Sequence, residues 1–215
     1  MSESPAPATA EPPKQSKPVL WDERIARPFV RPLARWGVTA NQVTTVSLVL
    51  ALGAAAMFAT GIGWLAHVAA GVFMIARFID HLDGQLARLS GKTSRFGYYY
   101  DFITGTLSYA ALFTGVGIGL SAPAGAGWWW MALGIATTFL VFANTLFQWL
   151  DETRRGIEAM KYPAAGGFEM EDAIYLIGPI TWLGWLMPFC VLGFVGTGAY
   201  CAWTVYQFTR KRPPP

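Results

Sequence analysis

Long apolar runs separated by short polar segments make up most of this sequence after residue 36. A helix needs about 20 apolar residues to cross a bilayer, with about 17 as the lower limit. Six runs reach that limit, at about 43–59, 64–90, 97–120 and 128–150, and two more within 172–209 on either side of a turn near 184–188. The pattern predicts an all-α polytopic membrane protein with six transmembrane helices in one domain, residues 37–210.

The segment ahead of these runs has two parts of different composition. Residues 1–18 are rich in Pro, Ala and polar residues, which predicts a disordered cytoplasmic tail. Residues 19–36 carry apolar side chains at roughly helical spacing among four arginines, which is typical of an amphipathic helix on a membrane surface. Pro28 and Pro32 would bend that helix, and an irregular basic linker is the alternative interpretation.

The distribution of charge predicts how the chain is oriented. Hydrophobic residues make up 53% of the sequence and the mean hydropathy is +0.36, which excludes an ordinary soluble domain. Most of the 16 Lys and Arg residues gather before the first run, around 88–95 and 154–161, and at 210–212. By the positive-inside rule both termini lie in the cytoplasm, and we expect a prokaryotic inner membrane. Topology thus accounts for the basic residues without a nucleic-acid partner.

Three carboxylates interrupt the apolar pattern between the second and third runs. Asp80 and Asp83 are three residues apart and share one face of a helix, and Asp101 stands on the next helix. An ionisable group within a membrane segment costs roughly 2.5–3.5 kcal/mol and usually serves function. Gathered carboxylates repel each other unless a cation neutralises them, and oxygen ligands suit Mg²⁺ or Mn²⁺. Asp80 could instead form a buried ion pair with Arg77 on the same helix face.

The sequence around these carboxylates resembles the signature of the CDP-alcohol phosphotransferases, membrane enzymes of phospholipid biosynthesis. The family pattern is D-x2-D-G-x2-A-R-x8-G-x3-D-x3-D. Seven of its eight fixed positions match here, namely Asp80, Asp83, Gly84, Ala87, Arg88, Gly97 and Asp101. Taken singly, the small residues would indicate tight helix packing and the arginine a topology charge, but their joint spacing favours the family.

The resemblance implies an activity and a set of binding residues. Enzymes of this family transfer a phosphatidyl or similar substituted phosphoryl group from a CDP-alcohol to an acceptor alcohol and release CMP. By resemblance, the three matched aspartates would ligate Mg²⁺ or Mn²⁺ at a cytoplasmic active site, and the chain could form a homodimer. The remaining matched residues would contact the nucleotide, and these are Gly84, Ala87, Arg88 and Gly97.

A shorter similarity lies at the start of the first run. Residues 39–44 resemble the family's opening T-P-N-x-x-T, with Ala40 in place of Pro, so Asn41 and Thr44 are further nucleotide-binding candidates. Thr39 or Asn41 could also simply cap the first transmembrane helix.

Charged residues near the later runs have two interpretations each. Arg154 and Arg155 follow the fourth run and could bind a phosphate on the acceptor, although simple topology charges would stand there too. Glu169, Glu171 and Asp172 precede the fifth run, where the helix dipole favours carboxylates in any case.

Gly105 occupies the last signature position, where the family has an aspartate. In the family that aspartate completes the second metal site and is the proposed base for the acceptor hydroxyl, and glycine can do neither. His81 is the nearest titratable replacement, although it points about 100° away from Asp80 around the helix. The acidic residues ahead of the fifth run, a water molecule or a substrate phosphate are the other candidates.

Three classes of function therefore remain open. The first is an active phosphotransferase, which we favour because the rest of the signature is kept. The second is a catalytically silent relative that binds CDP-lipid or metal without turnover. The third is a cation or proton transporter, since intramembrane carboxylates also mark ion pathways.

Overall fold

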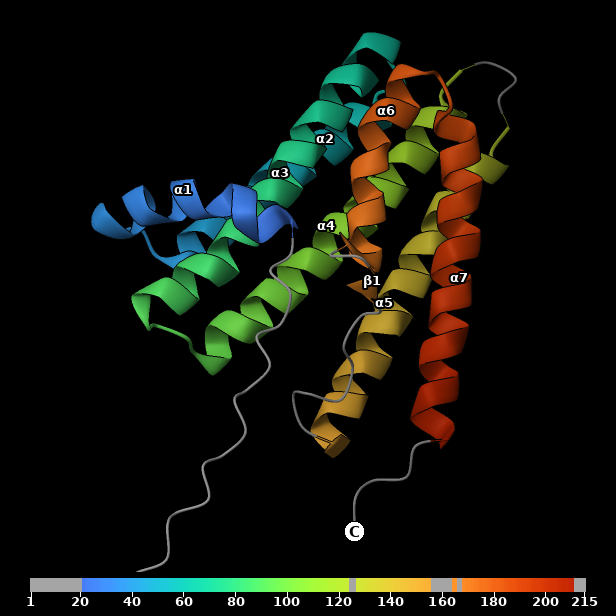
Figure 1. Ribbon diagram of the computed structural model, residues 1–215. Coiled ribbons are helices and arrows are strands. Elements are labelled where there is room, and N and C mark those ends of the chain that lie inside the picture. Colours follow the sequence, from blue (N-terminus) through green and yellow to red (C-terminus); the bar gives the residue numbers. More distant parts are fainter. Residues whose placement is uncertain (1–20, 124–126, 156–163, 166–167, 211–215) are drawn as a thin grey trace, which may run out of the picture.

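The computed structural model describes residues 21–123, 127–155, 164–165 and 168–210 (Figure 1). Seven α-helices account for nearly all of this described part, which confirms the all-α prediction. They are α1 (Trp21–Arg35), α2 (Ala40–Ala59), α3 (Gly63–Ser90), α4 (Arg95–Ser121), α5 (Trp129–Arg155), α6 (Ile177–Trp182) and α7 (Leu186–Arg210). A hairpin of β1 (Ala164–Ala165) and β2 (Phe168–Glu169) and a 3-10 helix, η1 (Met170–Leu176), lie between α5 and α6. The tail predicted at 1–18 lies outside the described residues.

Five of the described helices are long and apolar enough to cross a membrane, namely α2, α3, α4, α5 and α7. Where the sequence predicts a further crossing, within 172–184, the chain forms η1 and then only six residues of α-helix in α6. Pro179 has no N–H to bond the carbonyl of Tyr175, so the α-helical pattern does not continue back through that turn. Figure 1 shows this segment rising to the end of the bundle where α2 and α3 are joined.

Local signals set the helix ends near the acidic residues. Thr39 caps α2 in a capping box: its hydroxyl accepts from the Gln42 N–H, and the Gln42 side chain accepts from the Thr39 N–H. Thr39 rather than Asn41 is therefore the cap. α3 ends at Gly91, whose φ of 65° is a left-handed conformation that suits glycine. The short connection that follows lets both α3 and α4 pack against α2.

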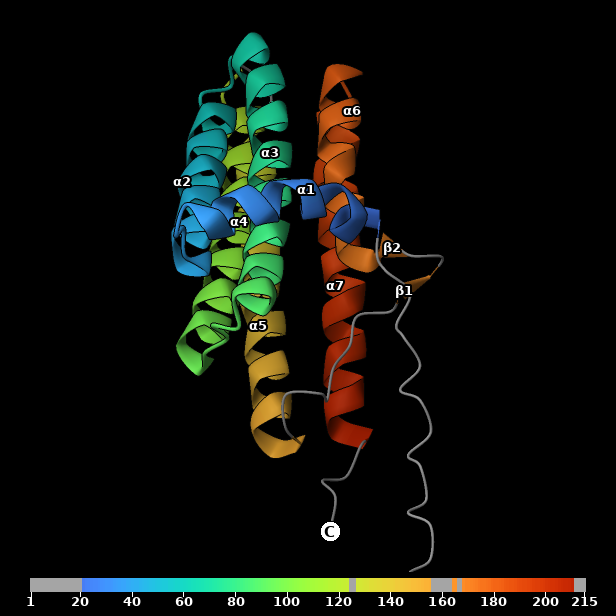
Figure 2. The ribbon, with the colours of Figure 1, turned by 60° about the vertical axis from the view of Figure 1, so that its left-hand side comes forward.

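α1 lies across the bundle and packs on α3, at a steep angle to α2 and α3 (Figure 2). It is helical through Pro28 and Pro32, so the helix rather than the irregular linker is the correct interpretation of this segment. Val30 is buried in a small cluster with Leu82 and Leu86 of α3. Part of the apolar side of α1 thus covers α3. That α1 lies on a membrane surface stays a prediction.

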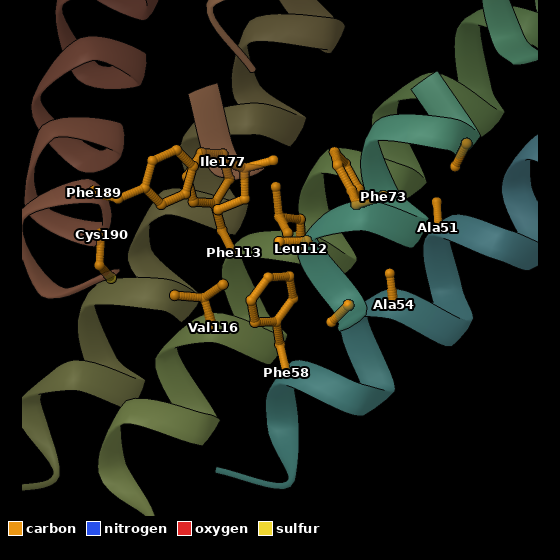
Figure 3. Close-up of a cluster of buried hydrophobic side chains, with 13 residues drawn as sticks. Ala51, Ala54, Phe58, Phe73, Leu112, Phe113, Val116, Ile177, Phe189 and Cys190 are labelled. Carbon is orange, nitrogen blue, oxygen red and sulfur yellow. The ribbon is translucent and has the colours of Figure 1, made fainter. Parts of the chain in front are cut away.

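Glycines bring α4 into close contact with α2. A Cβ atom at Gly115 would lie 2.3 Å from the carbonyl oxygen of Ala55, and one at Gly119 would lie 2.0 Å from that of Phe58. Lipid gives helices no hydrophobic reason to associate, so such close backbone packing is what holds membrane helices together. A buried cluster that includes Phe58 and Leu112 fills the space beside this contact (Figure 3).

Candidate active site

The fold brings the three signature carboxylates together. Asp80 and Asp83 come from α3 and Asp101 from the first turns of α4, and one oxygen from each lies within 4.8 Å of the others. We call these residues the carboxylate triad. Asp83 is buried, with 3% of its surface exposed, and the other two are half-buried. The spacing seen in the sequence thus corresponds to one compact acidic site.

Hydroxyl groups of α2 hold the two α3 carboxylates. Thr44 donates a hydrogen bond to Asp83 Oδ2, and Ser47 Oγ lies 3.1 Å from Asp80 Oδ1. Thr44 is among the residues expected from the opening motif, whereas the sequence analysis missed Ser47. Since Ser47 is three residues after Thr44 on the same helix face, that spacing was the signal that could have found it.

Arg77 partly offsets the charge of the carboxylate triad. Its Nη1 lies 2.8 Å from Asp80 Oδ2, so the ion pair considered from the sequence does form. The ion pair leaves the site acidic, because the three carboxylates carry more negative charge than one guanidinium can offset. A site with an excess of hard, buried carboxylate oxygens fits Mg²⁺ or Mn²⁺ better than a soft metal.

Several nucleotide candidates lie around the same helix ends. A Cβ at Gly97 would lie 3.2 Å from Asn41 Oδ1, so this glycine lets the start of α4 approach the start of α2. A Cβ at Gly84 would lie 3.6 Å from a guanidinium nitrogen of Arg88, whose side chain is exposed. Ala87, one residue before Arg88 on α3, is half-buried. Nucleotide binding by these residues stays a prediction.

On the other side of the carboxylate triad lies a cavity of about 660 Å³, which we call the central cavity. Residues from α3, α4, α5, η1, α6 and α7 line it. Its lining includes Asp80 and Asp101 at one end, and Phe113 and Phe189, whose rings stack with centroids 6.0 Å apart, at an apolar end. Gly105 lines the central cavity too, and nothing lies within 4 Å of where its Cβ would be. An aspartate would therefore have room there.

The central cavity also has a polar wall, which the sequence analysis missed. It consists of side chains from α4, α5 and α7: Tyr98, Thr106, Asn144, Thr145, Gln148, Glu152 and Tyr200. The Tyr98 hydroxyl donates to Glu152 Oε1, and Gln148 Nε2 donates to the Tyr200 hydroxyl over 3.1 Å. No short motif could reveal this wall, because its members are up to 102 positions apart in the sequence.

The candidate replacements for the missing aspartate lie elsewhere or are not described. His81 Nδ1 is 2.7 Å from the carbonyl oxygen of Arg77 and 3.2 Å from the Tyr175 hydroxyl, and His81 is not among the described residues lining the central cavity. The side chains of Glu169 and Glu171 lie outside the described residues, and Asp172 of η1 is half-buried and not in the described lining of the central cavity.

The predicted acceptor-binding arginines are not seen at the central cavity. The Arg154 guanidinium stacks on the ring of Phe208 at 4.1 Å, and Arg154 is absent from the described lining. The side chain of Arg155 lies outside the described residues. Acceptor binding by this pair stays a prediction.

Comparison with known proteins now gives the context of this site. Residues 37–204 match the CDP-alcohol phosphatidyltransferase family. The chain is 35% identical over 107 residues to the archaetidylinositol phosphate synthase of Pyrococcus horikoshii, covering 50% of this chain and 52% of that protein. It is 31% identical over 124 residues to the phosphatidylinositol phosphate synthase of Mycolicibacterium smegmatis, covering 57% and 50%. The matched part thus spans about half the length of these curated relatives.

Solved structures share the fold. The crystal structure of Mycobacterium tuberculosis phosphatidylinositol phosphate synthase with CDP-DAG bound superposes with a TM-score of 0.69 at 19% identity, over 87% of this chain and 94% of that one. The same enzyme in complex with manganese and citrate gives a TM-score of 0.64 at 20% identity, over 86% and 89%. The family match covers most of the chain, including the whole carboxylate triad. This chain belongs to the CDP-alcohol phosphatidyltransferase family.

Proposed function

We propose that this protein transfers a phosphatidyl or similar substituted phosphoryl group from a CDP-alcohol to the hydroxyl of an acceptor alcohol and releases CMP, as a step in phospholipid biosynthesis. The observation that carries the proposal is the carboxylate triad, which stands at the family's spacing on two helices beside a large cavity. Family membership and the shared fold support it.

In this proposal Asp80, Asp83 and Asp101 hold one or two divalent cations, Mg²⁺ or Mn²⁺. Such an ion, when bound, neutralises negative charge on the pyrophosphate as the transfer proceeds. The chain's own residues prepare the site for it: Thr44 and Ser47 orient two of the carboxylates. A manganese complex of the Mycobacterium tuberculosis enzyme supports this choice of metal.

The two substrates would approach the carboxylate triad from opposite sides. The CDP group would lie against Asn41, Thr44, Gly84, Ala87, Arg88 and Gly97, where the exposed arginine can bind phosphate charge. The acceptor would enter from the central cavity. Its hydroxyl oxygen bonds to the phosphorus that carries the alcohol, and the bond from that phosphorus to the CMP oxygen breaks.

The proton of the acceptor hydroxyl needs a destination, and Gly105 cannot take it. We propose that Gly105 is a departure from the family's fourth aspartate and that the proton passes to water in the central cavity or to a phosphate oxygen. The same glycine is the specific observation that favours a second candidate, a silent relative that binds CDP-lipid or metal without turnover.

One assay separates these candidates. The purified chain in detergent is incubated with CDP-diacylglycerol, Mg²⁺ or Mn²⁺ and a panel of alcohols, and CMP release is measured beside Asp101→Ala. Metal-dependent release that Asp101→Ala abolishes would support the transferase. Metal binding without release under every condition would favour the silent relative, and metal-independent release would contradict both.

We also propose six crossings of a prokaryotic inner membrane, with η1 and α6 together forming the crossing that follows α5. Seven residues of 3-10 helix and six of α-helix extend about 23 Å, which is about 7 Å less than the hydrocarbon core, and local thinning of the bilayer would accommodate that difference. Six crossings place both termini and the carboxylate triad in the cytoplasm. Reporter fusions ending near Gly61 and Gly184 should be exported, and a cytoplasmic signal at Gly184 would contradict this topology.

A further inference from the structure

The charged residues of the central cavity are mostly negative. Among its described lining, the carboxylates are Asp80, Asp101 and Glu152, and Arg77 is the one Lys or Arg residue. Arg77 is already paired with Asp80 at 2.8 Å. With a divalent cation held by Asp80 and Asp101, an acceptor that carries a phosphate would still meet the negative charge of Glu152 and, among the described lining, no cationic cluster of the kind that phosphate recognition uses.

Glu152 stands apart from the carboxylate triad. It is not one of the three residues whose oxygens gather within 4.8 Å, so a cation bound there would leave its negative charge in place. Its Oε1 accepts a hydrogen bond from Tyr98. Its Oε2 is buried and has no hydrogen-bond partner within the described part of the chain. A buried carboxylate oxygen without a donor is unfavourable, so the site is incomplete until a ligand supplies one.

Aromatic side chains share the central cavity with Glu152. Tyr98, Phe102 and Tyr200 all line the central cavity, and the rings of Tyr98 and Phe102 are nearly parallel, with centroids 6.5 Å apart. The faces of such rings attract ammonium and quaternary ammonium groups. A carboxylate with a free oxygen beside several aromatic rings is suited to a small organic cation rather than to a polyol phosphate.

We infer that the acceptor is a small amino alcohol without a phosphate group, whose ammonium is bound by Glu152 in the central cavity. This inference rests on the proposed function. Tyr98, which bonds Glu152, is one helical turn before Asp101 on α4, so an amine at Glu152 leaves its hydroxyl close to the carboxylate triad. The relatives named above are archaetidylinositol and phosphatidylinositol phosphate synthases, so this inference assigns the chain another acceptor than their names state.

Acceptor competition and one charge-removing variant test the inference. CMP release from CDP-diacylglycerol by the full chain with Mn²⁺ is measured with ethanolamine, L-serine, glycerol, myo-inositol 1-phosphate and glycerol 3-phosphate. We expect the two amino alcohols to exceed both phosphates at least tenfold in kcat/KM. Glu152→Gln keeps the size of the side chain and an oxygen for Tyr98, so we expect it to raise the KM for the amino alcohol at least tenfold while Mn²⁺ binding is unchanged.

Asp151→Asn is the matched control, because it removes the neighbouring carboxylate of α5, which is not in the described lining of the central cavity. It should leave the KM for the amino alcohol within about twofold of the unaltered chain. Turnover of myo-inositol 1-phosphate in preference to the amino alcohols, or an unchanged KM in Glu152→Gln, would overturn the acceptor inference while leaving the transferase intact. No metal-dependent turnover with any acceptor would overturn the proposed function and this inference with it.

Discussion

The two sides of the carboxylate triad are built from different kinds of contact. On the α2 side, Thr44 and Ser47 reach Asp83 and Asp80 from positions one turn apart on a single helix. On the side of the central cavity, most of the lining comes from α4, α5, η1, α6 and α7, and hydrogen bonds join separate helices, over 39 positions from Thr106 to Thr145 and over 54 from Tyr98 to Glu152.

Under the proposed function, this difference would separate the chemistry from the choice of substrate. The α2 side fixes the carboxylates through short, regular spacings, so a change there would alter the proposed metal site itself. The wall of the central cavity is assembled from separate helices, each of which can change one side chain without moving an aspartate. A family built in this way can keep one reaction and vary the acceptor.

The largest expected effect comes from the carboxylate triad. Asp101→Asn removes one charge from the site that we propose holds a divalent cation, and we expect CMP release to fall about 10²–10³-fold or more. Mn²⁺ binding, measured by isothermal titration, should weaken in parallel. Glu152→Gln is the contrasting variant, since it should change the acceptor KM and leave Mn²⁺ binding intact. Equal Mn²⁺ affinities in Asp101→Asn and the unaltered chain would contradict the distinction between a metal site at the carboxylate triad and an acceptor site at Glu152.

Gly105 lines the central cavity, and Gly105→Asp sharpens the comparison. The open space at its Cβ position accepts a carboxylate one turn beyond Asp101. General bases contribute about 10²–10⁴-fold, so we expect turnover with the preferred acceptor to rise by up to about 10²-fold. Gly105→Asn is the matched control, similar in size and unable to take a proton. A fall in turnover in both variants would show that the space at Gly105 is needed by the substrate.

The α2 side of the site was largely predictable from the sequence, because local spacing carries the information. Asp80 and Asp83 are three residues apart on one helix, so their common face follows from helical geometry. That Asp101 joins them depended on the family resemblance, since no periodicity links one helix to the next. A cap at Thr39 or Asn41 followed from their hydrogen-bonding chemistry, and the structure was needed to identify Thr39.

The central cavity could not be predicted, because it depends on which helices become neighbours. Glu152 and Arg154 stand in one polar stretch, yet Glu152 bonds Tyr98 of α4 while Arg154 stacks on Phe208 of α7. A position two residues along a helix points about 160° away, so burial and partner differ completely. The short α6 was missed for a similar reason: apolar composition alone does not distinguish one long helix from η1 and α6 in succession.

A smaller effect is expected from the hydroxyl that holds Asp83. Thr44→Val keeps the shape of the side chain and removes the hydrogen bond to that carboxylate. Groups that orient metal ligands typically contribute 10–100-fold to metal affinity or activity, and we expect a Mn²⁺ affinity about tenfold weaker. Thr45→Val is the control, because the Thr45 hydroxyl lies 2.8 Å from that of Tyr100 and does not touch the carboxylate triad. Equal weakening in both variants would argue against an orienting role for Thr44.

The smallest expected effect on metal binding comes from a variant that changes helix packing and leaves the carboxylate triad unaltered. In Gly119→Ala the new Cβ would lie 2.0 Å from the Phe58 carbonyl oxygen, so α2 and α4 must move apart. Overpacking of this kind costs about 1–3 kcal/mol, which corresponds to a Tm lower by several degrees in a chain of this size. Gly53→Ala, with nothing within 4 Å of its Cβ, should leave the Tm unchanged. Because α3 and α4, which carry Asp80 and Asp101, both pack against α2, a Gly119→Ala protein that stays folded should bind Mn²⁺ only slightly more weakly. A loss as large as that in Asp101→Asn would mean that the carboxylate triad depends on helix spacing more than on local sequence.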